Sequence, residues 1–301
     1  MAYRNIYITK PSSISIEQNN LSISQEDVHI RVPIEDMLTI MLEDRSTSFS
    51  SYALAKLAEN DVLIYFCDRT HLPCAVLTPF ALHTVQVKRI RQQINISTPI
   101  KKQIWKEIVK AKIVNQSLCL KYTNSEHEDI EGYTKRVLSG DSNNIEAQVA
   151  RKYFNRLFGE DFTRDQDCLI NSCLNYGYAI LRGLVARSLV VHGFEPSLGV
   201  HHKNELNNFC LADDLIEPLR PIVDLFTKNI NINSITSTLD RGLKARLYDI
   251  INHTISFSNE THSVATATDL MIESLVRSID SNDPRHLQFP TLQELHRHSY
   301  E

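Results

Sequence analysis

The chain has 301 residues, of which 42% are hydrophobic and 23% charged, and its formal net charge is −4. This composition is typical of a globular protein long enough for two domains, and it excludes collagen-like and largely disordered chains. The negative balance argues against a protein that coats nucleic acid without specificity, although a local basic patch is still compatible with DNA binding.

The cysteines and the N-terminal residues indicate a cytoplasmic protein. No two of the six cysteines form a Cys-x-x-Cys pair, so we interpret them as small buried side chains in a reducing compartment. The first residues, MAYRNIYITK, lack the apolar core of a secretion signal. The most apolar stretch, 178–191, contains Arg182 and Arg187 and is shorter than the roughly 20 residues of a membrane span. We therefore expect no membrane partner.

Residues 3–80 favour β-structure. Apolar and polar residues alternate in YRNIYIT, LSIS and DVHIRV, and VLIYFCD is a continuous apolar run typical of a buried strand. Asn19 and Asn20 lie between two such runs and predict a hairpin turn. A short helix, SSYALAKLAEN, is expected between strands, with Ser50 or Ser51 as its N-cap.

From about residue 84 the apolar residues recur at helical steps, as Ile104, Ile108 and Ala111 do around Trp105. The segment TPFALHT separates the two patterns. We therefore predict an α+β protein with a small β-rich domain, 1–82, and a larger all-α domain, 83–301, that ends in a loosely held tail containing Pro284 and Pro290. Further helices are expected over 125–139, 144–158, 165–192, 210–228, 238–253 and 262–279.

Acidic candidates for a metal site lie near the end of the segment 193–221. Asp214 and Glu217 are three residues apart and share one face of a predicted helix. Glu217 lies beside the apolar face of that helix, where a carboxylate usually needs a partner. Asp213 and Asp214 have a simpler interpretation as charges that favour the start of a helix.

Two adjacent histidines, His201 and His202, precede these acids. Neighbouring side chains on a loop or strand point in different directions, so at most one of the two is expected to contact a given metal ion. An ordinary polar histidine is the alternative for either.

A further candidate is Glu146, in the first turn of the helix predicted over 144–158 and next to its apolar stripe. Asn143 or Asn144 is expected to cap this helix, and an ordinary first-turn acid is the alternative interpretation of Glu146. One histidine and two or three carboxylates form a mixed nitrogen and oxygen site that suits Mg²⁺ or Mn²⁺. These ions serve phosphoryl chemistry by neutralising charge on the phosphate.

Basic residues are concentrated in residues 88–112, against a single acid, Glu107. Lys106 and Lys110 are four residues apart and share a helix face, and Arg182 interrupts an otherwise apolar helix. We interpret these side chains as candidate contacts to a DNA phosphate backbone, with a solvated helix face as the alternative. The basic residues of the run are Lys88, Arg89, Arg91, Lys101, Lys102, Lys106, Lys110 and Lys112.

Three motifs occur in a fixed order: Asn-Tyr-Gly-Tyr at 175–178, Gly-Phe-Glu-Pro-x-Leu-Gly at 193–199 and Asp-Leu-Ile-Glu-Pro-Leu-Arg-Pro at 214–221. With IWKEIVKAKI at 104–113, they resemble the CRISPR-associated integrase and endonuclease family of the adaptation module, the first-numbered Cas proteins. The LGVHH and NELNNF segments resemble the branch that accompanies type II systems. The two-domain plan agrees with this resemblance.

By motif, the resemblance implies that Glu146, His202 and Glu217 are the catalytic residues and hold the metal ion, Mg²⁺ or Mn²⁺. It leaves open whether Asp214 joins or replaces Glu217 as a ligand. His201 stands where many relatives have leucine, so the resemblance gives it no role.

The resemblance also implies the activity and the partners. The expected reaction inserts captured DNA fragments at the leader–repeat junction of a CRISPR array, through attack of a 3′-hydroxyl on a phosphodiester, with associated DNA endonuclease activity. The β domains would form a homodimer, and a dimer of the second-numbered Cas protein would bridge two such dimers on double-stranded DNA. The type II effector nuclease and a further adaptation protein are expected to assist. The alternatives are a metal-dependent nuclease that only hydrolyses DNA and a non-catalytic DNA-binding scaffold.

Overall fold

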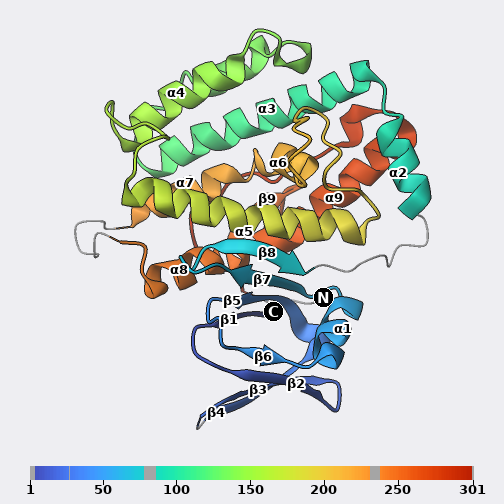
Figure 1. Ribbon diagram of the computed structural model, residues 1–301. Helices are drawn as coiled ribbons and strands as arrows, with labels where there is room; N and C mark the ends of the chain where they lie inside the picture. Colours follow the sequence, from blue (N-terminus) through green and yellow to red (C-terminus); the bar gives the residue numbers. More distant parts are fainter. Residues whose placement is uncertain (1–3, 27, 78–85, 231–237, 300–301) are drawn as a thin grey trace. The chain divides into compact units, whose positions relative to one another are not determined.

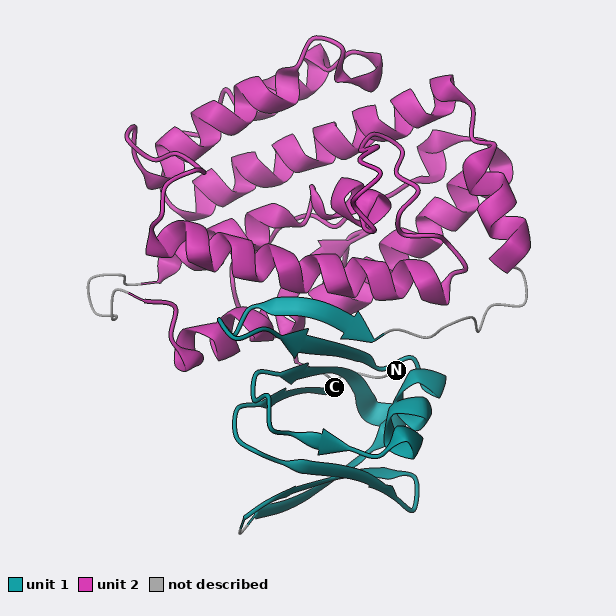
Figure 2. Ribbon diagram, viewed as in Figure 1, with its two compact units in different colours: residues 1–84 teal, residues 85–301 magenta. Residues whose placement is uncertain are grey.

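The computed structural model confirms the α+β class, because strands dominate the first part of the chain and helices the second (Figure 1). The chain divides into two compact units, residues 1–84 and residues 85–301 (Figure 2). The segment TPFALHT, expected to separate the two patterns, lies outside the described residues. The structure describes residues 4–26, 28–77, 86–230 and 238–299.

Unit 1 contains two four-stranded sheets. In the first, with the order β1-β5-β7-β8, only β8 is antiparallel to its neighbour. In the second, with the order β4-β3-β2-β6, β2, β3 and β4 form an antiparallel meander and β6 pairs in parallel with β2. The strands are β1 (Arg4–Ile8), β2 (Ser13–Glu17), β3 (Asn20–Gln25), β4 (Val28–Pro33), β5 (Met37–Leu42), β6 (Ser48–Phe49), β7 (Leu63–Cys67) and β8 (Pro73–Leu77).

Local sequence explains two features of unit 1. The predicted hairpin joins β2 to β3, but its turn lies at Gln18 and Asn19, one residue earlier than expected, where φ is 49° and 62°. Positive φ at both central residues matches the twist of the flanking strands. Helix α1 (Ser51–Glu59) begins as predicted, because the Ser50 hydroxyl accepts a hydrogen bond from the Ala53 N–H group at 3.1 Å.

Unit 2 is mostly helical, although a two-stranded antiparallel sheet, β9 and β10, means that it is not all-α as expected. Helix α3 lies between α4 and α7, and α5 contacts α6, α7, α8 and α9 (Figure 1). The α-helices are α2 (Gln86–Ile94), α3 (Thr98–Tyr122), α4 (Ile145–Phe158), α5 (Leu169–Val191), α6 (Cys210–Ile216), α7 (Arg220–Asn229), α8 (Arg241–Tyr248) and α9 (Val264–Ser281). Shorter elements are η2 (Glu131–Arg136), η3 (Ser139–Asp141), η5 (Asp249–Asn252), β9 (Thr254–Phe257), β10 (Glu260–Ser263) and η6 (Pro284–His286).

Two helix predictions were wrong in a way that matters for the site. Residues 125–139 form the 3-10 turns η2 and the start of η3 rather than one α-helix. The helix expected over 210–228 is interrupted, since α6 ends at Ile216 and α7 begins at Arg220. Prolines at 218 and 221 lack the N–H group that a continuous helix needs, which explains the break.

The expected loose C-terminal tail is also a wrong prediction. Leu287 and Leu292 are buried, and an isolated bridge pairs Thr291 with Ser256. The side chain of Asn115 in α3 donates to the carbonyl oxygen of Pro290 at 2.9 Å and accepts from the N–H group of Leu292 at 3.0 Å. A segment with two prolines is therefore fixed by side-chain hydrogen bonds that take the place of a regular ladder.

The six cysteines are free. Among the described residues, no helix is long and apolar enough to cross a membrane.

Candidate metal and DNA site

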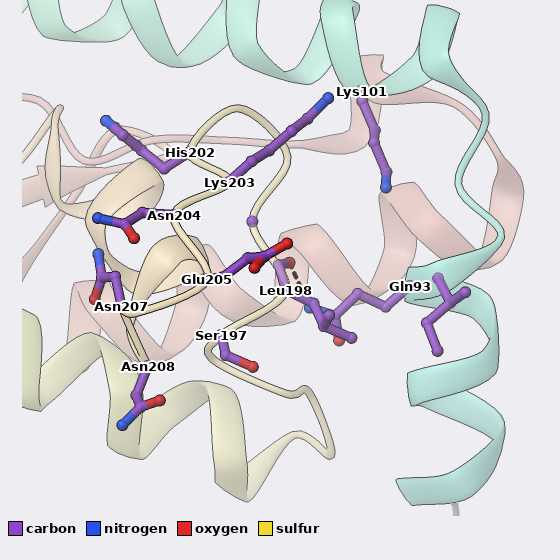
Figure 3. A pocket seen from close by; sticks show the side chains of 12 residues that line it. Gln93, Lys101, Ser197, Leu198, His202, Lys203, Asn204, Glu205, Asn207 and Asn208 are labelled. Carbon is purple, nitrogen blue, oxygen red and sulfur yellow. Dashed lines mark hydrogen bonds between the residues drawn. The ribbon is translucent and has the colours of Figure 1, made fainter.

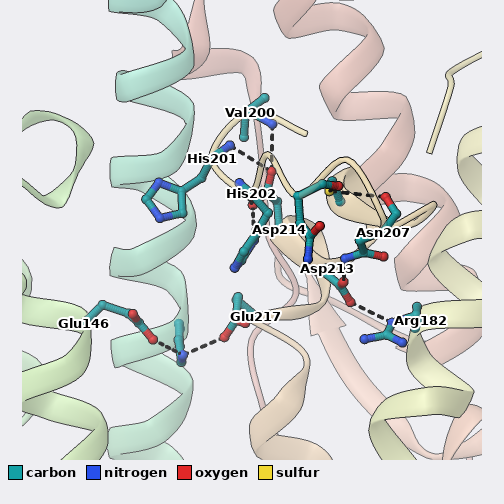
Figure 4. A network of polar contacts seen from close by, with 12 residues as sticks. Glu146, Arg182, Val200, His201, His202, Asn207, Asp213, Asp214 and Glu217 are labelled. Atoms are coloured by element: carbon teal, nitrogen blue, oxygen red, sulfur yellow. Dashed lines mark hydrogen bonds and ion pairs between the residues drawn. The ribbon is translucent and has the colours of Figure 1, made fainter. Parts of the chain in front are cut away.

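The loop that precedes α6 is organised around Asp214. The Asp214 side chain is 0% exposed and accepts hydrogen bonds from the backbone N–H groups of Val200, His201 and His202, at 2.7, 3.0 and 3.1 Å. Backbone donors that converge on a buried carboxylate satisfy its charge and fix the path of the loop. Both Asp214 oxygens are occupied in this way (Figure 4).

Gly199 allows this loop to pass close to Asp214. A Cβ atom at position 199 would lie 2.4 Å from the carbonyl oxygen of His202 and 3.0 Å from Asp214 Oδ2. The first distance is shorter than any real Cβ contact, so a side chain at this position would displace the loop. Position 199, in the Leu-Gly turn, therefore requires glycine, because there is no room for a side chain.

His202 is oriented by the same carboxylate. Its Nδ1 lies 2.6 Å from Asp214 Oδ1, and this hydrogen bond raises the pKa of His202 above its usual range. Because Nδ1 is engaged, Nε2 is the ring nitrogen that can bind a ligand. Figure 4 shows the ring directed towards Glu217, whose negative charge also raises the pKa of His202.

Glu217 lies at the break between α6 and α7 and is 6% exposed. Its Oε1 pairs with Arg220 at 3.0 Å and its Oε2 with Lys112 at 2.5 Å. Burial disfavours the charged form of Glu217, but the two cations outweigh it and hold the pKa of Glu217 below its usual range. Glu217 is therefore an ionised carboxylate in a buried position.

Lys112 joins Glu217 to Glu146. Its ammonium group is 2.5 Å from Oε1 of Glu146 as well as 2.5 Å from Oε2 of Glu217, and the residue is 8% exposed. Burial lowers the pKa of Lys112, but the two carboxylates outweigh it and raise the pKa overall. One buried cation is therefore shared by two acids that come from different parts of the chain.

Glu146 is positioned by a cap that differs from the one predicted. Asn144 is the N-cap residue of α4, but its side chain caps nothing. Instead the Asp141 carboxylate accepts hydrogen bonds from the N–H groups of Ile145 at 2.9 Å and Glu146 at 3.0 Å. A negative side chain here satisfies the free donors of the helix and leaves the Glu146 carboxylate to face Lys112.

The donors fit a divalent cation in their chemistry. Among the described residues, Oε2 of Glu217 is buried and accepts no hydrogen bond of good geometry, and its charged contact is the Lys112 ammonium group. The lysine therefore stands where a cation is shared by two carboxylates, one of which faces the His202 ring. Within the described ranges, however, no three His, Cys, Asp or Glu side chains already surround a common point.

The structure thus brings Glu146 and Glu217 together through Lys112, and places His202 next to Glu217. Asp214 is less suited to be a ligand than expected, because its oxygens hold the loop and the imidazole. From the sequence, Lys112 was grouped with the basic run and no partner was expected for it. The signal for Lys112 was its place on the apolar side of α3, between Ile108 and Ile113.

His201 takes a different direction from His202, as expected of neighbours. Its ring stacks on the indole of Trp105, with ring centroids 3.9 Å apart and planes 3° from parallel. Burial lowers the pKa of His201. The adjacent hollow, about 390 Å³ in volume, is lined by Lys101, Lys102 and Lys203 together with both rings.

The candidate DNA contacts fall into two groups. Lys110 pairs with Glu107 at 3.0 Å and Arg182 with Asp213 at 2.7 Å, so both have a partner within the chain. Lys106 is half-buried, and among the described residues it forms no ion pair with a carboxylate. In the basic run, Arg89 is buried against Asp280 and belongs to the helix packing.

A second hollow of about 510 Å³ lies along the loop, on the side of His202. Figure 3 shows Lys101 and Lys203 along one rim of this hollow and His202 further along the loop. The lining also includes one acid, Glu205, and the amide side chains of Asn204, Asn207 and Asn208. Of the two hollows, only the smaller one has lysines and no acid among its described lining residues.

The chain matches known proteins along most of its length. The family model described as "CRISPR associated protein Cas1" matches residues 6–239. A relative named CRISPR-associated endonuclease Cas1, from Neisseria meningitidis serogroup C (strain 8013), is 36% identical over 304 aligned positions that cover 100% of both chains. A second relative, named CRISPR-associated endonuclease Cas1 2 and from Saccharolobus solfataricus, is 29% identical. The alignment covers 70% of this chain and 69% of the relative.

Solved structures share the fold. A casposase bound to integration product has a TM-score of 0.74 at 18% identity, covering 93% of this chain and 90% of its own. A Cas1 protein from Thermotoga maritima has a TM-score of 0.73 at 16% identity, and the match covers 92% of this chain and 97% of that protein. A Cas6-RT-Cas1–Cas2 complex matches with a TM-score of 0.71 at 17% identity, covering 95% of this chain and 36% of that chain.

The family model spans well over half of the chain, and the Neisseria relative aligns with all of it, including the segments that carry Glu146, His202 and Glu217. The chain therefore belongs to the Cas1 family.

Proposed function

We propose that this Cas1 chain is a metal-dependent DNA integrase that inserts captured fragments at the leader–repeat junction of a CRISPR array. The observation that carries the proposal is the cation shared by Glu146 and Glu217 beside the oriented imidazole of His202. The casposase neighbour, bound to its integration product, supports a fold able to join DNA strands. The full-length match to the Neisseria protein supports the type II-like branch.

Glu146, His202 through Nε2, and Glu217 would hold Mg²⁺ or Mn²⁺, since two carboxylate oxygens and one imidazole nitrogen suit these ions. When bound, the ion would neutralise charge on the phosphate and favour the attacking oxygen. Asp214 would orient His202 rather than bind the ion, because its carboxylate holds the imidazole through Nδ1. Arg220 keeps Glu217 ionised, which a cation ligand requires.

The reaction is a direct transesterification. The 3′-oxygen of the captured strand forms a bond to phosphorus while the bond from phosphorus to the leaving 3′-oxygen of the target strand breaks. The proton lost by the attacking hydroxyl is balanced by the proton gained by the leaving oxygen, so no covalent protein intermediate is needed. The chain contributes position and fixed charge, which are the main requirements of phosphoryl transfer.

The proposed partners are the captured double-stranded fragment, the repeat DNA and other protein chains. We assign the β-rich unit to homodimer formation, and a dimer of the second-numbered Cas protein to the bridge between two dimers. The Cas6-RT-Cas1–Cas2 neighbour supports the latter partner. The type II effector nuclease and a further adaptation protein would act in fragment choice, and the reaction would take place in the cytoplasm. Lys106, Lys110 and Arg182 are proposed DNA contacts.

A second candidate function is DNA hydrolysis without joining, with water in place of the 3′-hydroxyl. The Neisseria relative, which is named an endonuclease, favours this alternative. Both functions use the same residues and differ only in the attacking oxygen.

A strand-transfer assay separates these functions. Purified protein, its small Cas partner, short duplexes with free 3′-hydroxyls and a supercoiled plasmid carrying the repeat are mixed with Mn²⁺ or Mg²⁺. We expect joined product from the wild type, and a loss of roughly a hundredfold or more for His202→Ala and Glu217→Gln. Glu273→Gln, which changes an exposed acid on α9, is the matched control. Plasmid cutting without joining favours hydrolysis, and joining that survives both substitutions contradicts the site.

A further inference from the structure

The carbonyl oxygen of Pro218 lies at the break between α6 and α7, and Pro218 directly follows Glu217. In a continuous helix this oxygen would accept a hydrogen bond from an N–H group three or four residues later. Pro221 has no N–H group, and the N–H group of Ile222 donates to Leu219 instead, at 3.1 Å. The break therefore leaves a buried backbone acceptor, beside a proposed metal ligand, that needs a donor from elsewhere.

Asn115 on α3 supplies that donor. Its side-chain amide donates to the carbonyl oxygen of Pro218 at 2.7 Å and to that of Pro290 at 2.9 Å. The amide oxygen accepts a hydrogen bond from the N–H group of Leu292 at 3.0 Å. Asn115 is 2% exposed, and both of its amide hydrogens are used. Because the oxygen must face Leu292, the C-terminal segment fixes the direction of the amide and so presents a donor to Pro218.

Helix α3 holds Glu217 by its side chain and by the backbone next to it. The ammonium group of Lys112 is 2.5 Å from Oε2 of Glu217, and Asn115 lies three residues later on the same helix face. Helix α3 also lies between α4, which carries Glu146, and α7 (Figure 1). A shift of the backbone at Pro218 would therefore change the separation of the two carboxylates, and a binding site tolerates errors of only about 0.5 Å.

We propose that Asn115 is a positioning residue for the metal site: it sets the backbone at Pro218, and with it the Glu217 carboxylate, while the C-terminal segment 290–292 holds the amide in place. The proposal rests on the proposed function for the role of Glu217 as a ligand. The chain of hydrogen bonds from Leu292 to Pro218 is independent of any activity. Residues near the C-terminus thus affect metal binding through α3.

The first test needs no metal. Hydrogen–deuterium exchange is followed in the full-length protein for two peptides, one covering 214–223 and one covering 287–298. Asn115→Ala removes all three hydrogen bonds, so we expect exchange about tenfold faster than in the wild type in both peptides. Asn115→Ser keeps a hydroxyl and leaves room for a bridging water, so it should fold where Asn115→Ala does not, with an intermediate effect.

Ser274→Ala is the matched control. Ser274 on α9 is 0% exposed, and its hydroxyl oxygen accepts a hydrogen bond from the N–H group of Gln288 at 2.9 Å. It therefore anchors the same C-terminal segment from another helix, without a hydrogen bond to the backbone beside Glu217. This variant should speed exchange in the peptide 287–298 and leave the peptide 214–223 as in the wild type.

The second test measures metal binding directly. Mn²⁺ is titrated into each folded protein, and free Mn²⁺ is followed by electron paramagnetic resonance. Asn115→Ala should bind Mn²⁺ about tenfold more weakly than the wild type, whereas Ser274→Ala should bind it equally well. In the strand-transfer assay, the Mn²⁺ concentration for half-maximal joining should rise by the same factor for Asn115→Ala, with little change in the rate at saturating Mn²⁺. A role in stability alone would not separate the two variants in this way.

Wild-type exchange in the peptide 214–223 for both Asn115 variants would overturn the proposal, as would wild-type Mn²⁺ affinity in both. A Ser274→Ala protein that loses Mn²⁺ affinity as Asn115→Ala does would also contradict it, since any loosening of the C-terminal segment would then suffice. A wild type that binds no Mn²⁺ contradicts the proposed function instead. The exchange measurement still decides in that case whether Asn115 sets the backbone beside Glu217.

Discussion

Asp214 and Glu217 are buried acids three residues apart, yet they are stabilised in opposite ways. Asp214 is surrounded by backbone N–H groups and an imidazole, whereas Glu217 is surrounded by the side-chain cations Lys112 and Arg220. Backbone donors belong to the loop itself and cannot leave without unfolding it. A lysine side chain can rotate away and give its place to another cation. The first carboxylate therefore maintains structure, and the second can exchange its partner.

The largest effect should come from removing the exchangeable cation. Lys112→Met leaves Glu146 and Glu217 without their shared charge, and breaking a buried ion pair in this way costs about 3–5 kcal/mol. Urea denaturation without metal should show this loss in the free energy of unfolding. Mn²⁺ should restore more stability to the variant than it adds to the wild type, because the ion then meets no competing ammonium group.

Lys121→Met is the control, since Lys121 is exposed and on the same helix. A Lys112→Met protein with wild-type stability, or with the wild-type response to Mn²⁺, would show that Lys112 does not occupy the place of a cation.

A smaller effect is expected at Asp214. Asp214→Asn keeps the shape but turns an amide N–H group towards backbone donors, and it should lower the free energy of unfolding by about 2–3 kcal/mol. The measurement is again urea denaturation with and without Mn²⁺. Here the ion should add no more stability than it adds to the wild type, because the lost contacts are within the loop. Recovery by Mn²⁺ equal to that of Lys112→Met would remove the distinction between the two acids.

A third buried acid, Asp224, sharpens the comparison. Its partners are the hydroxyl groups of Tyr153, at 2.8 Å, and Tyr178. Burial raises the pKa of Asp224 from 3.8 to about 6, and the tyrosine hydrogen bonds offset this only in part. Neutral donors thus stabilise a buried carboxylate less than cations do.

The pH dependence follows from this raised pKa. Between pH 6 and pH 4 the folded protein binds a proton at Asp224 that the unfolded chain does not yet bind, so this site adds stability as the pH falls. The gain is on the order of 2 kcal/mol. Denaturation at several pH values should show that Asp224→Asn lacks this gain, so that its free energy of unfolding falls relative to that of the wild type by about 2 kcal/mol from pH 6 to pH 4. Parallel curves for the two proteins would contradict the assignment.

The ordered motifs could be read from local spacing and a glycine turn, and the family resemblance that they carry pointed to Glu146 and Glu217, which spacing alone left as candidates. The partner role of Lys112 was missed, since its carboxylates come from α4 and from the break after α6, and the sequence does not give their proximity. The role of Asp141 was also missed, because Asp141 caps α4 from a 3-10 turn that lies between the helices expected over 125–139 and 144–158. Both the partners of Lys112 and the capping role of Asp141 depend on contacts that local spacing in the sequence does not show.

The β-rich unit was easier to predict than the C-terminal segment for the same reason. Alternation and turn residues define β2 and β3 locally, apart from one residue in the turn. The tail has no such periodicity, and its order comes from Asn115, which is far away in the sequence. The prolines suggested a loosely held tail, because proline disfavours the regular backbone hydrogen bonds of helices and sheets. Proline content does not show whether side-chain hydrogen bonds hold the segment instead.

Asn115 also links that tail to the site, since its amide donates to the carbonyl oxygen of Pro218, next to Glu217, at 2.7 Å as well as to Pro290. The backbone beside a proposed ligand and the last segment of the chain therefore share one side chain. During synthesis the earlier helices emerge first, but the ribosome must release residues around 290 before this junction can close. The nascent chain would thus have an unfinished site until residues around 290 have left the ribosome, because Asn115 lacks one of its two partners until then.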